Sequence, residues 1–464
     1  MKDLKKNRSL ISLIQEVGCD YVGEKSQQLA IDCQIANVVC DSRKVIPGSL
    51  FVAIVGEQAD GHDYIADAVT AGCAAVVCLR GRISAAPAEK MGVVVLETSD
   101  SNEIYGALCA AYFSHPAKHL RLLGITGTNG KTTSTYLLEQ ILIEANRSVG
   151  VIGTVNNRYT IPRRIQKVLA TRFTTPEPFL LQELLFEMAC QDIEFVVMEV
   201  SSHALAQARV AGLVFEVAAF TNLSRDHLDY HETMEEYFQA KLLLFRQYLA
   251  SNGTAVLPCP EKQSYAGRLK EECDRRQVNT ICWGEQEKAD LQILDTDSSV
   301  EGTRITYRLG SKTFYLRSPL PGRFNVENLM TVVGICRILG LQEDTVIQGA
   351  QSAQGAPGRV ERVSLSSLTG RSEPLILVDY AHTPDALEKV LVALGKLPHG
   401  KLISVVGCGG DRDKGKRPLM GKIGVRNSDI AIITSDDTRN EKIEQINQQI
   451  IDGIPQKTSQ LLVF

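Results

Sequence analysis

Apolar runs separated by glycine, proline and short helical stretches fill the chain up to about Ser101. The runs SLFVAIVG, CAAVVCL and MGVVVLE have the composition and length of β-strands. This pattern predicts a compact N-terminal α/β unit, which we place at residues 1–101.

Longer α/β units follow in a central region, which we place at residues 102–355. The run LRLLGIT leads into a glycine turn and then into a helix whose one face carries four apolar residues, Leu137, Leu138, Ile141 and Leu142. The runs EFVVMEVSS and FEVAAFTNL are apolar enough to be strands that are buried on both faces of a parallel sheet.

A third region starts near AQGAPGRVERV and again alternates strands with helices. LILVDYA precedes PDALEKVLVAL, KLISVVGC precedes a loop, and DIAIITS precedes EKIEQINQQII. We place this C-terminal domain at residues 356–464. The sequence shows neither an internal repeat nor a low-complexity tract.

Composition agrees with a folded protein of several domains. The chain has 464 residues, of which 44% are hydrophobic and 22% charged. Its formal net charge is -4 and its pI about 6.1, so nothing favours a nucleic-acid partner.

Targeting signals are not evident. No apolar run approaches the roughly 20 residues of a membrane span, and the N-terminal MKDLKKNRSLISLIQEVGCD lacks the apolar core of a secretory signal. The twelve cysteines are scattered from Cys19 to Cys408 without a CxxC pair, which favours reduced, mostly buried thiols. We therefore expect a cytoplasmic protein that does not bind membranes.

The stretch from Thr126 to Thr133 has the features of a phosphate-binding loop. It joins a strand to a helix, and its glycines let backbone N–H groups face a phosphate at the positive end of the helix. Lys131 can reach the β- and γ-phosphates and the Thr132 hydroxyl can bind Mg²⁺. Ile125 stands where the strict Walker spacing has glycine, so the match is to a variant, and a plain strand–turn–helix connection is the alternative.

A dinucleotide fingerprint is a weaker interpretation. In VVGCGGDRDKG, Gly407, Gly409 and Gly410 are followed by Arg412 where the fingerprint has glycine or alanine.

Several polar residues follow the predicted central strands. Glu199 ends one strand and His227 follows the next, so both are candidates to meet a nucleotide-bound Mg²⁺ at the same edge of the sheet. Spacing does not choose between His227 and its neighbours Asp226, Asp229 and His231.

Lys241 lies on a predicted helix among the apolar residues of YFQAKLLLF. From spacing alone, its stem would lie along the core while its head group reached water.

The ordered motifs GITGTNGKTT, MEVSSHALAQARV, TNLSRDHLDYH, PGRFNVENL, DYAHTPDAL and GCGGDRDKGKRPLMG resemble those of the Mur ligase family, and most closely its UDP-N-acetylmuramoyl-tripeptide synthetases. CDSRKVIPGSLFVAIVGEQADGHDYI resembles the family's UDP-binding domain. The resemblance implies an α/β fold of three domains: a UDP-binding domain, a central P-loop-type domain with a parallel sheet, and a Rossmann-like C-terminal domain that binds the amino acid.

The resemblance also implies a reaction in peptidoglycan precursor synthesis, and hence in cell-wall biogenesis and division. ATP would phosphorylate the D-glutamyl carboxylate of UDP-muramoyl-dipeptide, and the amine of the incoming amino acid would then form an amide. Such an enzyme takes ATP, Mg²⁺ and these small molecules as its partners, and we expect a monomer.

Roles of individual residues also come from the resemblance. Lys131 and Lys241 are the implied catalytic residues, and Lys241 would be carbamylated, which makes it an anionic ligand. Metal ligands would be Thr132, Glu199, His227 and carbamylated Lys241. ATP would be held by Gly127, Thr128, Asn129, Gly130, Lys131, Thr132, Thr133, Asn325, Asn328, Arg359 and Asp379. The UDP-substrate would be held by Ser42, Glu57, Gln58, Ala59, Thr174, Thr175, Ser201, Gln207 and Arg209.

Two departures from the family concern the amino-acid site. Family members that add meso-diaminopimelate carry Asp-Asn-Pro-Arg where this chain has Asp436, Asp437, Thr438 and Arg439. Arg439, with Arg412 beside it, could still pair with the distal carboxylate of diaminopimelate, so we expect that substrate rather than L-lysine. The chain also ends before the family's last strand and its Gly-Lys-Gly-His-Glu stretch, so we expect an incomplete, shortened C-terminal domain.

Three alternatives remain at this stage: a lysine-adding ligase, a ligase similar to folylpolyglutamate synthase, and a catalytically impaired nucleotide-binding relative. ATP hydrolysis without ligation would result if only the acceptor site were impaired.

Overall fold

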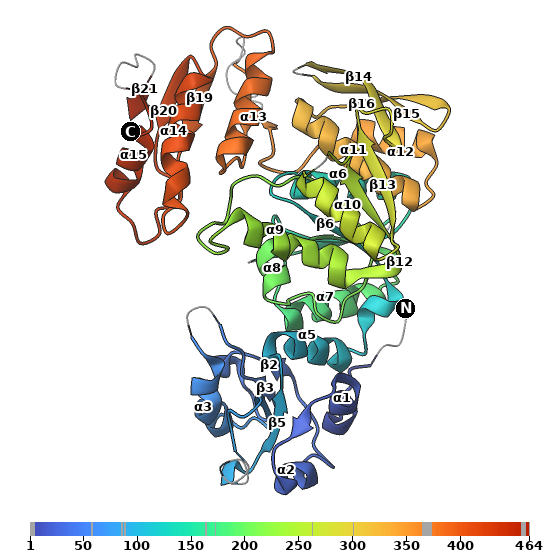
Figure 1. Ribbon diagram of the computed structural model, residues 1–464, viewed down its shortest axis with the longest axis vertical. Coiled ribbons are helices and arrows are strands. Elements are labelled where there is room, and N and C mark those ends of the chain that lie inside the picture. Colours follow the sequence, from blue (N-terminus) through green and yellow to red (C-terminus); the bar gives the residue numbers. More distant parts are fainter. Residues whose placement is uncertain are drawn as a thin grey trace. The chain divides into compact units, whose positions relative to one another are not determined.

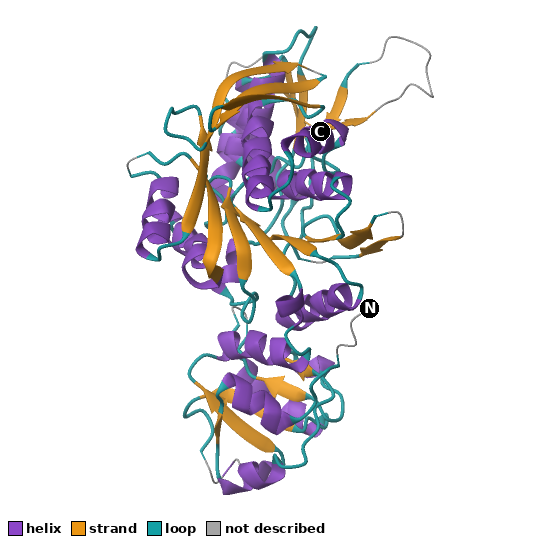
Figure 2. Cartoon of the chain, turned by 90° about the vertical axis from the view of Figure 1, so that its right-hand side faces the viewer, coloured by secondary structure: helices purple, strands orange, loops and turns teal. Residues whose placement is uncertain are grey.

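The computed structural model describes residues 5–56, 59–84, 87, 90–162, 165–171, 173–261, 263–299, 301–363, 374–455 and 461–463. The chain forms two compact α/β units. Figures 1 and 2 show its helices and strands. Unit 1 comprises Met1–Leu123, Arg147–Glu216 and Gln247–Ala250. Unit 2 comprises Gly124–Asn146, Val217–Arg246 and Ser251–Phe464.

The N-terminal part of unit 1 is a sheet with the strand order β1-β5-β4-β3-β2, in which β2 to β5 are parallel and β1 is antiparallel to β5. The sheet is buried on both faces: Leu50 and Val77 lie in the core beneath α1 and α5, and Phe51 and Val76 face the core beneath α3. This explains why the predicted strands are continuously apolar rather than alternating. The elements are α1 (Leu10–Val17), β1 (Asp20–Tyr21), α2 (Glu24–Leu29), β2 (Val38–Val39), β3 (Leu50–Val52), α3 (Ile65–Thr70), β4 (Ala75–Leu79), β5 (Val94–Thr98) and α5 (Ser101–Tyr112).

The rest of unit 1 has the strand order β6-β10-β7-β8-β9, with β10 parallel to β7 and with β8 antiparallel to both of its neighbours. Every residue of β10 is buried, which confirms the prediction from EFVVMEVSS. The elements are β6 (Arg121–Thr126, shared with unit 2), β7 (Val149–Ile152), β8 (Asn157–Ile161), β9 (Ile165–Leu169), α7 (Pro178–Cys190), β10 (Phe195–Glu199) and α8 (Ser202–Ala206).

In unit 2 the strand order is β16-β15-β14-β13-β12-β11-β6. Strands β12, β13 and β14 are parallel, whereas β14, β15 and β16 form an antiparallel meander, so the expected parallel sheet is in fact mixed. The elements are α6 (Lys131–Glu144), β11 (Phe215–Phe220), α9 (Met234–Leu243), a π-helical turn (Leu244–Tyr248), β12 (Leu249–Pro258), α10 (Tyr265–Arg275), β13 (Asn279–Gly284), β14 (Leu291–Ser299), β15 (Gly302–Leu309), β16 (Lys312–Ser318), α11 (Arg323–Ile338) and α12 (Glu343–Ser352).

Helix α6 is buried more widely than its sequence predicts. Its four apolar residues are fully buried, but Thr135 and Glu139 are buried too, because α11 and α12 pack against the helix. A Cβ atom on Gly349 of α12 would lie 2.7 Å from the Cα of Ile141, so glycine is needed for this close packing.

The C-terminal part of unit 2 is a separate α/β layer. Parallel strands in the order β19-β20-β21 lie with helices α13, α14 and α15 in this layer (Figure 1). Strands and helices share a buried core that includes Leu387, Met420, Ile433 and Ile450. The elements are the antiparallel pair β17 (Glu361–Val363) and β18 (Ile376–Val378), then α13 (Pro384–Gly395), β19 (Ile403–Val406), α14 (Arg417–Arg426), β20 (Ile430–Ile433), α15 (Ile443–Ile451) and β21 (Leu461–Val463). None of the helices in the described part of the chain combines the length and the apolar character of a membrane span.

Most cysteines are buried, as predicted. Burial raises the pKa of the Cys40 and Cys73 thiols to about 11, so both stay protonated at neutral pH.

Candidate functional site

The loop between β6 and α6 has a backbone that only glycine tolerates at two positions. Gly127 has φ 148° and Gly130 has φ 88°. A Cβ atom on Gly127 would lie 1.9 Å from the hydroxyl of Thr221, and one on Gly130 would lie 2.1 Å from the side-chain oxygen of Asn328. The predicted strand, turn and helix are therefore confirmed, and both glycines are required by close approach as well as by φ.

Hydrogen bonds hold this loop from several sides. The Lys131 ammonium group, in the first turn of α6, donates to the carbonyls of Gly127 and Thr128, each at 2.9 Å. The hydroxyl of Thr128 donates to Ser224 O at 3.2 Å and lies 3.2 Å from the hydroxyl of Tyr237. These contacts connect the loop to its own helix α6, to the segment after β11 and to α9.

Lys241 does not reach water. It is 1% exposed, donates from Nζ to the carbonyl of Gly127 at 3.0 Å, and lies 4.4 Å from the ring centre of Tyr237. Burial, reinforced by the positive charge of Lys131, lowers the pKa of the Lys241 amine well below its usual value. The interpretation of Lys241 as a lysine with a solvated head group is therefore wrong, because α9 directs the amine into the core, beneath the loop.

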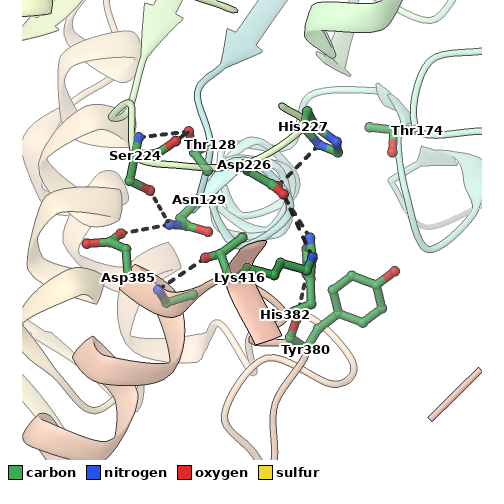
Figure 3. A network of polar contacts seen from close by, with 12 residues as sticks. Thr128, Asn129, Thr174, Ser224, Asp226, His227, Tyr380, His382, Asp385 and Lys416 are labelled. Carbon is green, nitrogen blue, oxygen red and sulfur yellow. Dashed lines mark hydrogen bonds and ion pairs between the residues drawn. The ribbon is translucent and has the colours of Figure 1, made fainter. Parts of the chain in front are cut away.

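Basic side chains from two parts of unit 2 surround Asp226. Its carboxylate is 4% exposed and lies 3.3 Å from His227, 3.5 Å from His382 and 4.0 Å from Lys416 (Figure 3). Burial by itself would raise the pKa of Asp226, but the hydrogen bond from His382 and the nearby positive charges lower it below the usual range. The structure thus brings together Asp226 and His227, whereas Asp229 is exposed.

The backbone at His227 is unusual, since φ is 54° at a residue that is not glycine. His231, the other histidine of this motif, is buried against the ring of Tyr237 at 5.2 Å between ring centres. Packing against this ring explains why His231 is buried.

Residues from the segment after α12 also contact the loop. Arg359 donates to the hydroxyl of Thr132 at 3.3 Å and stacks on the ring of Tyr380. The Asp379 carboxylate accepts hydrogen bonds from the N–H groups of Val360 and Ala381, each at 2.8 Å, which holds Val360 at its positive φ of 50°. Burial raises the pKa of Asp379 despite these bonds.

The two predicted asparagines of α11 lie together. The side chain of Asn328 donates to Asn325 at 3.1 Å, and Asn325 donates to Pro321 O at 2.7 Å. Asn328 is also the residue that approaches Gly130, so α11 forms one wall of the loop.

In unit 1, Glu199 is held at the end of β10. It is 1% exposed and accepts from the N–H and the hydroxyl of Thr154, at 2.9 and 3.0 Å. A Cβ atom on Gly153 would lie 2.3 Å from Glu199 Oε1. Sequence reasoning missed Thr154, because GTVNN after β7 carries no recognisable motif.

The residues predicted to hold the muramoyl-peptide gather around Glu199 in the same unit. Thr174 lies 3.0 Å from the Thr154 hydroxyl, Thr175 donates to Glu199 O at 2.8 Å, and Ser201 N–H donates to Thr175 at 3.1 Å. Arg209 donates to Gln207 and to the carbonyl of Thr175.

The predicted UDP contacts lie in two turns of the N-terminal sheet. Ser42 begins a short 3₁₀ turn, Ser42–Lys44, that is capped by Asp41. The carbonyl of Ala59 accepts from Gly56 N–H at 3.0 Å. Glu57 and Gln58 lie outside the described residues.

The predicted amino-acid site lies at the carboxyl ends of β19 and β20. Gly410 N–H donates to the carbonyl of Asp437 at 2.8 Å, so the loop that carries Arg412 packs on the loop from Asp436 to Arg439. The carboxylate of Asp437 lies 3.4 Å from Arg439 Nε and accepts from its N–H at 3.3 Å. Arg439 has a positive φ of 47° in this loop. The Asp437 carboxylate places a negative charge directly beside it.

Among the described residues, no three His, Cys, Asp or Glu side chains gather into a metal site. Mg²⁺ that is bound with a nucleotide takes most of its ligands from phosphate and water, so one hydroxyl and one or two carboxylates suffice. Thr132, 4% exposed at the start of α6, is suited to that role.

The α/β fold and the glycine-lined loop at the start of α6 are those of a nucleotide-binding protein of the P-loop type. Comparison with known families specifies the class further. The Mur ligase family catalytic domain matches residues 34–113, the Mur ligase middle domain residues 125–336, and the Mur ligase glutamate ligase domain residues 358–462. The chain belongs to the Mur ligase family, whose members are ATP-dependent amide-forming ligases.

Individual relatives cover most of the chain. The UDP-N-acetylmuramoyl-L-alanyl-D-glutamate–2,6-diaminopimelate ligase 1 of Clostridium acetobutylicum is 39% identical over 91% of this chain and 83% of its own length. The corresponding ligase of Gloeobacter violaceus is 42% identical over 91% of this chain and 82% of its own length. A solved structure of a ligase with that activity is 31% identical, covers 93% of this chain and 84% of its own, and has a TM-score of 0.64.

Proposed function

We propose that this chain joins meso-diaminopimelate to UDP-N-acetylmuramoyl-L-alanyl-D-glutamate at the expense of ATP. The observation that carries the proposal is the loop geometry: two lysines, Lys131 and Lys241, converge on the carbonyl of Gly127 beneath a loop that only glycines can form. The diaminopimelate ligases similar to this chain support the choice of substrates.

The reaction needs an activated carboxylate. The D-glutamyl carboxylate attacks the γ-phosphorus of ATP, ADP leaves, and the resulting acyl phosphate is then attacked by the amine of diaminopimelate, which releases phosphate and a proton. Lys131 and the N–H groups at the start of α6 neutralise the phosphoryl oxygens as negative charge moves toward ADP. Mg²⁺ would add positive charge to the same oxygens, held by Thr132 and by Glu199, His227 and Lys241 as further ligands.

Carbamylation of Lys241 is part of this proposal. Burial lowers the pKa of the Lys241 amine and so favours its neutral form, which is the form that adds CO₂ with loss of a proton. The carbamate would place a negative charge beside the Lys131 ammonium, where a Lys241 ammonium would be repelled. The burial of Lys241 at 1% exposure, which disfavours the ammonium form, supports this assignment.

The remaining assignments follow the same proposal. Residues 1–101 would bind the UDP end through Ser42, Glu57, Gln58 and Ala59. Residues 102–355 would bind ATP and, around Glu199, the peptide. Residues 356–464 would bind diaminopimelate through Arg412 and through Asp436 to Arg439. The enzyme would work as a monomer in the cytoplasm.

Phosphate release tests the proposal directly. ATP, Mg²⁺ and UDP-muramoyl-alanyl-glutamate are supplied with meso-diaminopimelate, with L-lysine or with neither, and tripeptide is measured in parallel. We expect release and tripeptide together only with diaminopimelate. Tripeptide with lysine alone would reassign the amino acid, release without tripeptide would mean an impaired acceptor site, and the absence of release would leave a nucleotide-binding relative.

A further inference from the structure

The phosphate loop is held by a side chain from a distant part of the same unit. Asn129, in the middle of the loop, donates from its side-chain nitrogen to the carboxylate of Asp385 at 2.9 Å (Figure 3). The two residues are 256 positions apart in the chain. Because a carboxylate only accepts hydrogen bonds, the amide nitrogen of Asn129 must be the group that faces Asp385.

The rest of Asn129 is already fixed by the end of β11. Its N–H donates to Asn222 at 3.0 Å, and its carbonyl accepts from the hydroxyl of Thr221 at 2.6 Å. Its side-chain nitrogen also lies 3.4 Å from the hydroxyl of Ser224. Asp385 is therefore the contact that ties this residue to α13, while the other contacts tie it to β11.

Asp385 sits at the second position of α13, after the capping Thr383 and after Pro384. An acidic residue there stabilises a helix by itself, and Lys389 one turn later pairs with it at 3.2 Å. Neither role requires the helix to point at the loop. The contact with Asn129 is thus an additional feature, and it makes use of a side chain that is only half-buried, at 31% exposure.

A change in the position of Asn129 would affect the residues that line the phosphate site. Gly130 follows directly and has no room on the side of Asn328, and Lys131 begins α6. The Asn129 side chain therefore supports, together with the backbone contacts to Asn222 and Thr221, the turn whose N–H groups would face the phosphates.

We propose that Asp385 is a positioning residue for the nucleotide, which acts through Asn129 to hold the phosphate loop in its binding conformation. The pairing of Asp385 with Lys389 keeps its negative charge from opposing the phosphates. This inference rests on the proposed ATP-dependent reaction, but nucleotide binding tests it separately from ligation.

The test compares Asp385→Ala with Asp385→Asn, which keeps an acceptor of the same shape. Loss of a charge-assisted hydrogen bond should raise the KM for ATP about ten-fold in Asp385→Ala, with a smaller change in kcat. Asp385→Asn should restore most of the affinity. Binding of a non-hydrolysable ATP analogue, measured by calorimetry, should weaken in parallel even where ligation is not observed.

Glu388→Ala is the matched control, because it removes an exposed acidic side chain from the same helix. It should leave the KM for ATP unchanged. In an Asn129→Ala background, Asp385→Ala should add less than about a two-fold effect, because the two residues would act through one contact.

Two results would overturn the inference. One is unchanged or tighter ATP binding in a folded Asp385→Ala protein, and the other is full additivity of the two alanine substitutions. If the wild-type protein binds the analogue but does not form tripeptide, the proposed function fails while the inference about Asp385 can still be judged from binding.

Discussion

The side-chain nitrogen of Lys241 lies 3.0 Å from the carbonyl oxygen of Gly127, in a site where the lysine is 1% exposed. Lys131 donates to the same oxygen at 2.9 Å. The carbonyl of Gly127 thus accepts hydrogen bonds from two lysine side chains. Only Lys131 belongs to the loop motif itself. Burial and the charge of Lys131 make protonation of Lys241 unfavourable, which lowers the pKa of its amine. The unprotonated amine is a nucleophile, whereas the ammonium of an exposed lysine is not.

Replacement of Lys241 by methionine should abolish ligation, since methionine keeps the volume but has no amine. Burial depresses the pKa of Lys241 below its value in the unfolded chain, so the unfolded state binds the proton more tightly and stability is lost as pH falls below about 10.5. Lys241→Met removes that cost, so its Tm at neutral pH should equal or exceed that of the wild type.

Short carboxylic acids or bicarbonate should partly restore activity to Lys241→Ala, because either can place a carboxylate where a carbamate would stand. Phosphate release at increasing acid concentration measures this. Absence of rescue in a folded Lys241→Ala protein, together with an active Lys241→Met, would rule out the carbamate.

Lys131→Ala should reduce ATP turnover by a factor of about 100 or more, since charge neutralisation and loop position are lost together. Lys401→Ala, which changes an exposed lysine, serves as the control and should turn over ATP normally. Near-normal turnover in Lys131→Ala would refute the assignment of the loop.

Gly153→Ala should displace the Glu199 carboxylate without replacing any charged residue. The added methyl would lie 2.3 Å from Glu199 Oε1, so the carboxylate must leave Thr154. We expect at least a roughly ten-fold loss of kcat, measured at saturating Mg²⁺. Gly395→Ala, where no heavy atom lies within 4 Å of the added Cβ, should be fully active, and equal activity of both variants would contradict a role for Glu199.

The C-terminal layer should lose stability in acid through Glu441. Hydrogen bonds from the fully buried Arg417, then from the N–H of Asp411, lower the pKa of Glu441 to about 2. A depressed pKa contributes stability above the usual value of 4.5, and this contribution is lost as pH falls toward 2.

Thermal unfolding from pH 6 to pH 3 should therefore show a smaller decrease of Tm in Glu441→Gln than in the wild type, together with a lower Tm at pH 6. Parallel pH profiles for the two proteins would show that Glu441 is not the group responsible.

Asp437 should influence which amino acid is accepted. Its carboxylate lies 3.4 Å from Arg439. If Arg439 binds the distal carboxylate of diaminopimelate as proposed, Asp437 would compete for that arginine and would attract the ammonium of lysine. Asp437→Asn should therefore raise the ratio of kcat/KM for diaminopimelate over lysine, by about five- to ten-fold. A lower ratio would mean that Asp437 binds the ammonium group of diaminopimelate instead.

The local sequence predicted the buried strands, the phosphate loop and the family of this protein. Continuous apolar runs such as FVVME predicted buried strands, and GTNGKTT predicted a strand–turn–helix loop, because strand burial and left-handed backbone angles leave direct marks on residue type. Ordered motifs also predicted the Mur ligase family. Each of these inferences depends on residues that are neighbours in the chain.

Tertiary structure alone decided the rest. The sequence around Lys241 is compatible with a solvated head group, and only the packing of α9 against the loop buries the amine. Likewise, the ion pairs of Asp226 with His382 and Lys416, the support of Glu199 by Thr154, and the contact between Asn129 and Asp385 each depend on segments far apart in the chain. The physical reason is that burial and charge pairing are properties of three-dimensional neighbours, whereas helix, strand and turn preferences belong to the local chain.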